Sequence, residues 1–266
     1  MNLPIIGLIR VVTRLCALGA VILFSAADYC ASNCFRLGDD SGRFRAAWLQ
    51  RSTRKFLRVL NIRVTTSGMP PRRGMLVSNH LGYLDIAVFG SIAPMIFVSK
   101  KEVRDWPVFG WLSRCAGTLF VNRNNRADTK RVTGEMARTL NKGVVVGLFP
   151  EGTSSDGASV LPFRAPLLEP AVSQGWPVTP AAISYQVTGG SVENEVCYWG
   201  DMDFLTHLMN LLSKEAVFAR VAFGTPVETH GDRKALALSL RSEVVQLIRS
   251  FAPAKATGEA FADLAR

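Results

Sequence analysis

A histidine and an aspartate five positions apart are the side chains in this sequence best suited to proton transfer. His80 can remove a hydroxyl proton near neutral pH, and the Asp85 carboxylate on its other ring nitrogen would fix the tautomer and stabilise the imidazolium. Residues that share a helix face lie three or four positions apart, so this pair does not belong to one helix. We therefore expect His80 in a loop after a short buried strand at 74–78, and Asp85 at the start of the next helix.

A second segment, Phe-Pro-Glu-Gly-Thr at residues 149–153, makes the pattern specific. At ordinary residue frequencies the His and Asp spacing arises by chance in roughly one chain in ten to one in five, but the pentapeptide arises in on the order of one chain in ten thousand. The sequence has no Gly-x-Ser-x-Gly nucleophile elbow, and its thiols have no visible histidine partner. We therefore expect direct activation of a hydroxyl by His80, without a covalent enzyme intermediate.

With these two segments the chain resembles the glycerolipid acyltransferase family, which includes bacterial 1-acylglycerol-3-phosphate acyltransferases. Four ordered motifs define that family, and the similarity covers about residues 60–225. The third motif departs from the family pattern after its threonine, and the fourth matches loosely. The matching positions are Asn79, His80 and Asp85 for the first motif, residues 117–123 for the second, 149–153 for the third and 178–181 for the fourth.

The resemblance implies an α/β fold, a mixed-sheet sandwich like that of glycerol-phosphate acyltransferases. It implies transfer of an acyl chain from acyl-CoA or acyl-carrier protein to a lysolipid hydroxyl, with His80 as general base and Asp85 holding it. Neither a cofactor nor a metal is expected. Arg123, past a predicted strand end, is expected to bind a lipid phosphate bidentately. Further substrate contacts are expected from Asn79, from Glu151, from Gly152 and Thr153, which otherwise only shape the turn, and from Lys100, which is otherwise a solvated cation.

The acceptor headgroup is left open by the third motif, because Ser154 replaces the arginine that the family pattern has next. This departure and the segment Trp-Gly-Asp-Met-Asp at 199–203 resemble branches that include lyso-ornithine lipid acyltransferases. We expect 1-acyl-sn-glycerol-3-phosphate as the acceptor, giving phosphatidate in phospholipid biosynthesis, with lyso-ornithine lipid or another lysolipid as the alternative. A protein of another class, a non-catalytic basic binder of membranes or nucleic acid, would leave His80 and Asp85 inert.

Positive charge is concentrated near the N-terminus, since residues 1–73 hold twelve Arg or Lys against three Asp, a net +9 of the chain's +10. A basic excess suits nucleic acid or an anionic membrane. Apolar runs at 3–9 and 15–27 favour the membrane, so nucleic acid is not an expected partner. Each run is too short to span alone, and joining them would place Arg10 and Arg14 at depth. We expect a helix embedded in one leaflet or marginally spanning; a cleaved signal peptide is the rival interpretation.

Residues 43–60 separate into a basic and an apolar side when wound as a helix. This pattern favours an interfacial helix on anionic lipid, although an ordinary core-packing helix has the same pattern. The basic side holds Arg43, Arg51, Arg54, Lys55 and Arg58, and the apolar side holds Trp48, Leu49, Phe56, Val59 and Leu60.

The 266 residues are 48% hydrophobic, which suits one α/β domain with a membrane-binding arm. We divide them into membrane-binding helices at 1–60, an α/β acyltransferase domain at 61–251 and a loosely held tail at 252–266. Acyl thioesters are expected in the cytoplasm, so the domain should lie on the cytoplasmic side of the inner membrane. The five cysteines are odd in number and lack metal-ligand spacing, so we expect them reduced and buried.

Strands and helices are expected to alternate along the acyltransferase domain, which favours an α/β sandwich. The expected strands lie near 63–66, 75–78, 95–99, 118–121, 144–149, 179–185 and 218–223, and the clearest helices near 129–140, 204–213 and 234–250.

Overall fold

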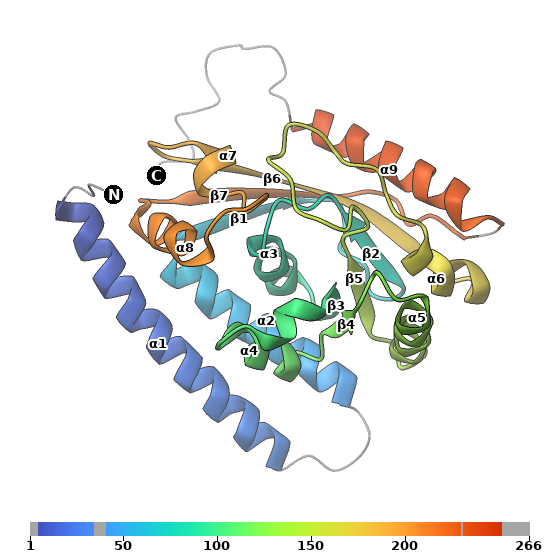
Figure 1. Ribbon diagram of the computed structural model, residues 1–266, viewed down its shortest axis with the longest axis horizontal. Coiled ribbons are helices and arrows are strands. Elements are labelled where there is room, and N and C mark those ends of the chain that lie inside the picture. Colours follow the sequence, from blue (N-terminus) through green and yellow to red (C-terminus); the bar gives the residue numbers. More distant parts are fainter. Residues whose placement is uncertain (1–4, 35–40, 230, 252–266) are drawn as a thin grey trace.

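A seven-stranded mixed sheet runs through the molecule, with helices on both of its faces (Figure 1). The computed structural model describes residues 5–34, 41–229 and 231–251, so the expected C-terminal tail lies outside the described residues. The predicted α/β fold, its seven strands and its three clearest helices are confirmed. The strands, in the spatial order β1-β7-β6-β2-β5-β3-β4, are β1 (Ile62–Ser67), β2 (Met75–Ser78), β3 (Met95–Lys100), β4 (Leu119–Val121), β5 (Val145–Leu148), β6 (Val178–Val187) and β7 (Val217–Phe223).

Neighbouring strands pair in parallel except β6 and β7, which are antiparallel. The helices that connect and cover them, as far as the structure describes the chain, are α1 (Ile5–Cys34), α2 (Ser41–Val59), α3 (Leu84–Ile92), α4 (Phe109–Cys115), α5 (Arg126–Asn141), α6 (Glu169–Gln174), α7 (Val192–Glu195), α8 (Phe204–Ser213) and α9 (Arg233–Arg249), with 3-10 turns η1 (Lys101–Asp105) and η2 (Pro166–Leu168).

Residues of the central strands point alternately into two separate apolar clusters. On β2, Leu76 joins the cluster formed with α2, α3 and α8, whereas Met75 and Val77 join the cluster formed with α5, α6 and α9. A strand covered on both faces has no polar side, which explains why these strands appear in the sequence as continuous apolar runs. The ends of β2 and β5 consequently lie in the interior, where the His80 segment and the 149–153 segment begin.

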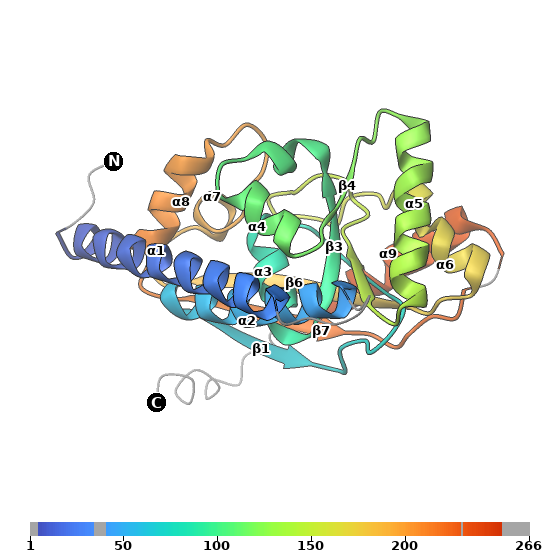
Figure 2. The ribbon, with the colours of Figure 1, turned by 90° about the horizontal axis from the view of Figure 1, so that it is seen from below.

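Helix α1 is one continuous helix of 30 residues, about 45 Å long, and it runs along the outside of the molecule past α8 and α2 (Figures 1 and 2). By length and composition alone it could cross a membrane. Its three charged residues all bond to the rest of the protein: Arg10 to Glu215, Asp28 to Arg51, and Arg14 to backbone carbonyls at the end of α8. The outward side of α1 is therefore apolar.

Helix α2 packs within the protein, against α1, α3, β1 and β3. Trp48 is only 1% exposed and its Nε1 donates to the Ser25 carbonyl on α1, while Leu57 and Leu60 are buried in the main core. We expected the apolar side of α2 to lie on lipid. In the structure that side packs against the core of the protein. The core-packing alternative describes it correctly.

The cysteines are free, as expected, but only two of them are buried. Cys115 and Cys197 lie in the interior, whereas Cys16, Cys30 and Cys34 are exposed on α1. The prediction of burial is wrong for these three, because an apolar sequence context on α1 belongs to the outward side of a peripheral helix rather than to a core.

Candidate active site

His80 and Asp85 form a hydrogen-bonded pair at the end of β2. The Nδ1 of His80 lies 2.8 Å from Oδ2 of Asp85, in the loop and in the first turn of α3 as the sequence predicted. The Asp85 side chain is fully buried and the His80 side chain is 20% exposed. Because the carboxylate accepts the Nδ1 proton, Nε2 keeps its lone pair and can act as a base toward a hydroxyl.

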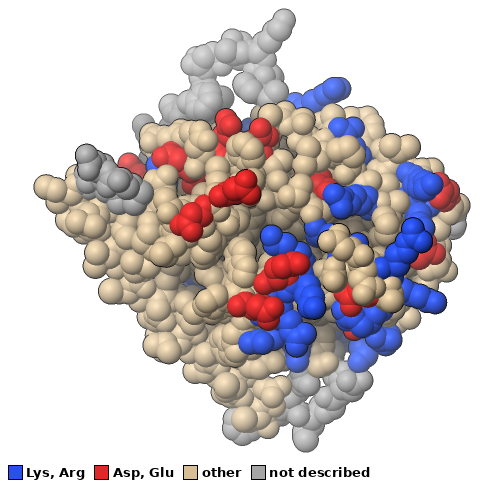
Figure 3. Space-filling view, viewed as in Figure 1, with Lys and Arg blue, Asp and Glu red and all other residues tan. Residues whose placement is uncertain are grey.

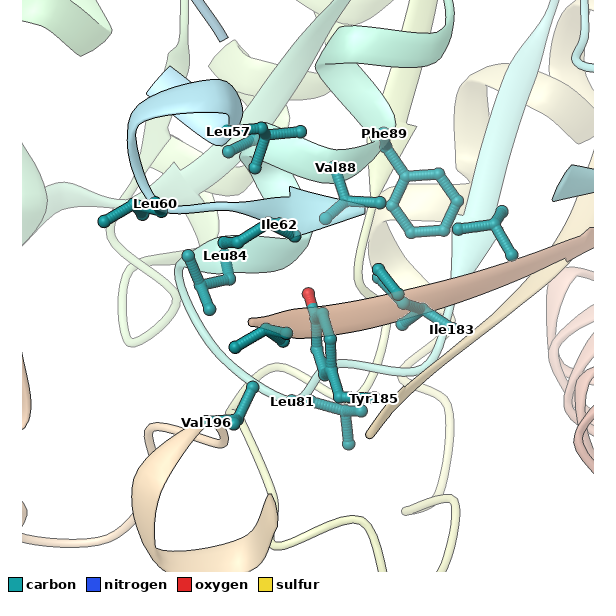
Figure 4. Packing of buried hydrophobic residues seen from close by; sticks show 14 of the residues in the cluster. Leu57, Leu60, Ile62, Leu81, Leu84, Val88, Phe89, Ile183, Tyr185 and Val196 are labelled. Carbon is teal, nitrogen blue, oxygen red and sulfur yellow. The ribbon is translucent and has the colours of Figure 1, made fainter. Parts of the chain in front are cut away.

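Asp85 is fixed by three further donors. Its Oδ2 accepts from the backbone N–H groups of Leu81 (2.6 Å) and Gly82 (3.0 Å), and its Oδ1 accepts from the Tyr185 hydroxyl (2.8 Å). The Tyr185 ring lies in the apolar core with its hydroxyl directed toward the start of α3 (Figure 4). Burial and the neighbouring Asp85 carboxylate raise the pKa of Tyr185, so it remains a neutral donor.

Tyr185 is a site residue that the sequence analysis did not identify. It lies on β6, 100 positions from Asp85, and belongs to none of the four motifs. One signal was available: a buried tyrosine on the apolar side of a strand normally needs a hydrogen-bond partner for its hydroxyl.

The segment 149–153 wraps around His80 and so brings the two sequence motifs together. The Phe149 ring stacks on the imidazole with centroids 4.2 Å apart and planes 14° apart. The backbone N–H of His80 donates to Oε1 of Glu151 at 3.3 Å, and the His80 carbonyl accepts from the N–H of Ser155 at 2.9 Å. These contacts fix the backbone and the ring of the base from two sides.

Glu151 is a buried carboxyl group rather than an exposed one. It is 2% exposed, and its Oε2 has no hydrogen-bond partner among the described residues. Burial raises the pKa of Glu151 to about 8, against the smaller opposing effect of the N–H groups of His80 and Leu161. The acid is therefore mostly neutral near pH 7, and it supports the His80 loop from inside.

Two arginines converge beside Gly152. Arg123, the second residue after β4, donates from Nη1 to the Gly152 carbonyl, and a Cβ at Gly152 would lie 3.0 Å from Nε of Arg164. Burial lowers the pKa of Arg123, and the Arg164 charge lowers it further. Both side chains line a small cavity of about 110 Å³ with Phe149, so cationic charge lies next to the ring that supports His80. Arg164 was not predicted; it follows the third motif without belonging to it.

The remaining predicted substrate residues are placed in three different ways. The Asn79 side chain is buried and bonds both to the N–H of Ile183 (2.9 Å) and to its carbonyl (3.0 Å), which ties the catalytic loop to β6. Thr153 is exposed on the turn after Gly152. Lys100 is exposed at the end of β3. Substrate contact by any of the three stays a prediction.

Comparison with known proteins agrees with this geometry. Residues 61–184 match the family model described as Acyltransferase. A lyso-ornithine lipid O-acyltransferase of Pseudomonas aeruginosa is 38% identical over 201 residues, which cover 73% of this chain and 77% of that protein. The chain belongs to the acyltransferase family. A 1-acyl-sn-glycerol-3-phosphate acyltransferase of Neisseria meningitidis serogroup B is 33% identical over 153 residues, covering 58% of this acyltransferase and 60% of that protein.

The fold of the acyltransferase has a solved counterpart. The crystal structure of a 1-acyl-sn-glycerophosphate acyltransferase from Thermotoga maritima superposes with a TM-score of 0.69, covering 92% of this chain and 95% of that one at 18% identity. At this identity the likeness establishes the mixed-sheet fold and says nothing of substrate.

Proposed function

We propose that this acyltransferase moves an acyl chain from a thioester to the hydroxyl of a lysolipid. Nε2 of His80 takes the hydroxyl proton as the oxygen attacks the thioester carbonyl. The tetrahedral intermediate then collapses, the ester forms, the carbon–sulfur bond breaks, and the thiolate leaves with the proton from His80. The observation that carries this proposal is the hydrogen-bonded His80 and Asp85 pair, in which the aspartate is fully buried and the histidine side chain is 20% exposed. The Phe149 ring that stacks on His80 belongs to a residue that also lines the cavity with the two arginines.

Arg123 and Arg164 suit an acceptor whose headgroup carries an anion. The reacting hydroxyl of a lysolipid is only a few bonds from its headgroup, so the headgroup must bind close to His80. The cavity at Gly152 is cationic and is lined by Phe149, whose ring stacks on His80. A guanidinium binds a phosphate or a carboxylate through paired N–H donors, so this site accepts either.

Two acceptors therefore suit this cavity, and we favour lyso-ornithine lipid. An ornithine headgroup combines a carboxylate with an ammonium. The Glu102 carboxylate lies near enough to Arg123 to raise its pKa, so an anion lies near the cations of the cavity without lining it. Ser154 in place of the family arginine removes one further cation. The named relative with the greater coverage acts on lyso-ornithine lipid. The Arg123 and Arg164 pair still supports 1-acyl-sn-glycerol-3-phosphate as the second candidate.

We place the enzyme at the cytoplasmic face of the inner membrane, held there by α1. Its exposed apolar residues include Ile5, Ile6, Leu23 and Phe24, each between 65% and 78% exposed. In the space-filling view the flank that α1 forms is almost without charge, while Lys and Arg gather on the opposite half of the same face (Figure 3). The acyl donor on that side of the membrane is acyl-CoA or acyl-carrier protein.

The acceptor is tested with purified enzyme, a labelled acyl thioester and the two lysolipids in parallel. Replacing Glu102 by Gln should raise the KM for lyso-ornithine lipid and lower the KM for 1-acyl-sn-glycerol-3-phosphate, because the lost anion attracts an ammonium and repels a phosphate. Glu228→Gln, an exposed change outside the site, should alter neither. Turnover of the phosphate acceptor alone would assign the enzyme to the second candidate, and turnover of neither would contradict the proposed function.

A further inference from the structure

A second polar cavity, of about 380 Å³, lies along the edge strand β4. Thr118, Phe120 and Asn122 line it from one side of the strand, while η1 contributes Lys101 and Arg104. Side chains three positions apart in a 3-10 helix lie one above the other, so these two cations face the groove together. We refer to this cavity as the β4 groove.

Both carboxylates of the β4 groove bond to the same arginine. Arg131 bonds to Asp128 (2.9 Å) and to Glu135 (2.7 Å), and its Nη2 donates to the Phe120 carbonyl at 2.9 Å. Neither Lys101 nor Arg104 forms an ion pair in the part of the chain that the structure describes. The lining therefore holds three cations, Lys101, Arg104 and Arg131, against two carboxylates. Lys101 and Arg104 are the cations that can bind an anionic ligand, together with the neutral polar groups of Thr118 and Asn122.

The β4 groove adjoins the headgroup cavity without being part of it. Asn122 lines the groove, and the next residue, Arg123, lines the cavity at Gly152 that also contains Phe149. An acceptor headgroup must bind near His80, because its hydroxyl is a few bonds away. The anionic end of a thioester donor is different, since a long pantetheine arm separates its phosphate from the reacting carbonyl. That phosphate must bind at a distance from His80.

We propose that the β4 groove binds the phosphate end of the donor's phosphopantetheine arm through Lys101 and Arg104. Acyl-CoA and acyl-carrier protein share this chemistry, so either can be the source. The inference rests on the proposed function, since it takes the donor to be such a thioester. It assigns the two cavities on either side of the end of β4 to the two substrates.

Chemical footprinting of the wild-type enzyme tests the proposal without any change in the chain. Lysines are acetylated with an amine-reactive reagent in the absence of acceptor, with CoA or acyl-carrier protein in separate arms, and the modified residues are read by mass spectrometry. We expect CoA, acyl-carrier protein or both to slow the modification of Lys101 about tenfold. The modification rate of Lys130, which is exposed on α5 outside the groove, should not change. Equal reactivity of Lys101 in every arm overturns the proposal.

Kinetics of a double variant give the second test. In Lys101→Ala/Arg104→Ala, the KM for the donor should rise about tenfold or more, with kcat and the KM for the acceptor within about twofold of wild type. The matched control is Lys130→Ala/Arg138→Ala, which removes the same two residue types from exposed positions on α5 and should change none of these constants. A donor KM that stays at the wild-type value, or a rise in the acceptor KM instead, overturns the proposal.

Steady-state kinetics with different donors test whether the donor phosphate contributes to binding. Wild type should use acyl-CoA or acyl-carrier protein at lower concentration than acyl-pantetheine, which lacks the phosphate, and the double variant should lose that preference. Equal KM values for the phosphorylated donors and acyl-pantetheine in wild type would contradict the inference. Failure of wild type to acylate either lysolipid would instead contradict the proposed function, whatever Lys101 footprinting shows.

Discussion

Asp85 determines how well His80 can work as a base. Its buried carboxylate accepts hydrogen bonds from the imidazole, from two backbone N–H groups and from Tyr185. With this number of donors the carboxylate keeps one orientation, so the imidazole that it holds keeps one orientation as well. The Phe149 ring stacks on the face of the His80 imidazole and restricts rotation of the imidazole out of its plane. The geometry required for proton transfer therefore exists before substrate binds.

Tyr185→Phe removes one donor to Asp85 and leaves the buried volume almost unchanged. We expect kcat to fall roughly tenfold with the acceptor KM unaffected, and the free energy of unfolding to fall by about 1–2 kcal/mol, the cost of leaving a buried acceptor oxygen without its partner. Steady-state kinetics measure kcat and KM, and urea unfolding measures the free energy of unfolding. Tyr198→Phe is the control, because Tyr198 packs near Tyr83 without bonding to Asp85. An unchanged kcat in Tyr185→Phe would show that this hydroxyl does not position the pair.

The buried acid Glu151 should make stability depend on pH. The folded protein keeps its proton up to pH about 8, whereas the unfolded chain releases it near the ordinary pKa of 4.5. Between those values the folded state binds more protons, so rising pH destabilises it, by up to about 1.4 kcal/mol per unit. Glu151→Gln imitates the neutral acid and should lose this dependence.

Urea unfolding of wild type and Glu151→Gln at several pH values between about 5 and 8 checks the direction. The free energy of unfolding of wild type, minus that of the variant, should decrease as the pH rises. A difference that increases with pH would mean that Glu151 is ionised and stabilised by a cation in the folded state.

For the helices and strands, the sequence was sufficient to predict the features that depend on local residue pattern. The strands were predicted because central strands buried on both faces appear as apolar runs, and the loop and helix positions of His80 and Asp85 followed from their spacing. Contacts between distant residues were not predictable in this way. The apolar side of α2 gave no sign that Trp48 would bond to α1, and nothing near Asp85 indicated Tyr185. The burial of Glu151 was not predictable either, because it depends on the folding of other segments over this residue. Acceptor contact by Glu151 stays a prediction.

Arg14 should be the main attachment of α1 to the rest of the protein. Its guanidinium donates to the carbonyls of Leu212 (2.9 Å), Lys214 (2.5 Å) and Glu215 (3.1 Å), which the end of α8 leaves without helical partners. We expect Arg14→Ala to release α1 and to raise the rate of proteolytic cleavage within α1 about tenfold or more, since each charged hydrogen bond contributes about 1.5–3 kcal/mol.

Limited proteolysis followed by mass spectrometry measures that rate, with Arg10→Ala as the control. Arg10 makes only a 3.8 Å ion pair with the exposed Glu215, so its loss should have little effect. Equal cleavage of Arg14→Ala and wild type would mean that apolar contacts with α2 and α8 are enough to hold α1.

For the whole molecule, the arrangement of charge and apolar surface sets its orientation on a membrane. Each charged side chain of α1 bonds to the body of the protein, so the helix can lie on lipid without bringing a charge into it. The basic surface and the two cavities at the end of β4 lie on other parts of the molecule (Figure 3). The side of the molecule that faces lipid is therefore distinct from its basic side.

Membrane binding through α1 is tested by placing charge on its outward side. Ile6→Asp/Phe24→Asp should weaken partition onto anionic phospholipid vesicles at least about tenfold, because a charged side chain in an apolar region of lipid costs about 2.5–3.5 kcal/mol at the bilayer centre and less near the surface. Vesicle sedimentation measures the partition. Met69→Asp/Leu238→Asp changes two equally exposed apolar residues away from α1 and should have little effect. Equal losses in both double variants would contradict a role specific to α1.

The most direct test of the account is acyl transfer from a labelled thioester by wild type and His80→Ala, with lyso-ornithine lipid and 1-acyl-sn-glycerol-3-phosphate as acceptors. We expect wild type to acylate a lysolipid and the variant to lose about 10²–10⁴-fold in kcat, the usual contribution of a positioned general base, with no acyl group bound to the protein. Undiminished transfer by His80→Ala, or a covalent acyl-enzyme that accumulates during turnover, would contradict the central claim that His80 activates the acceptor hydroxyl directly.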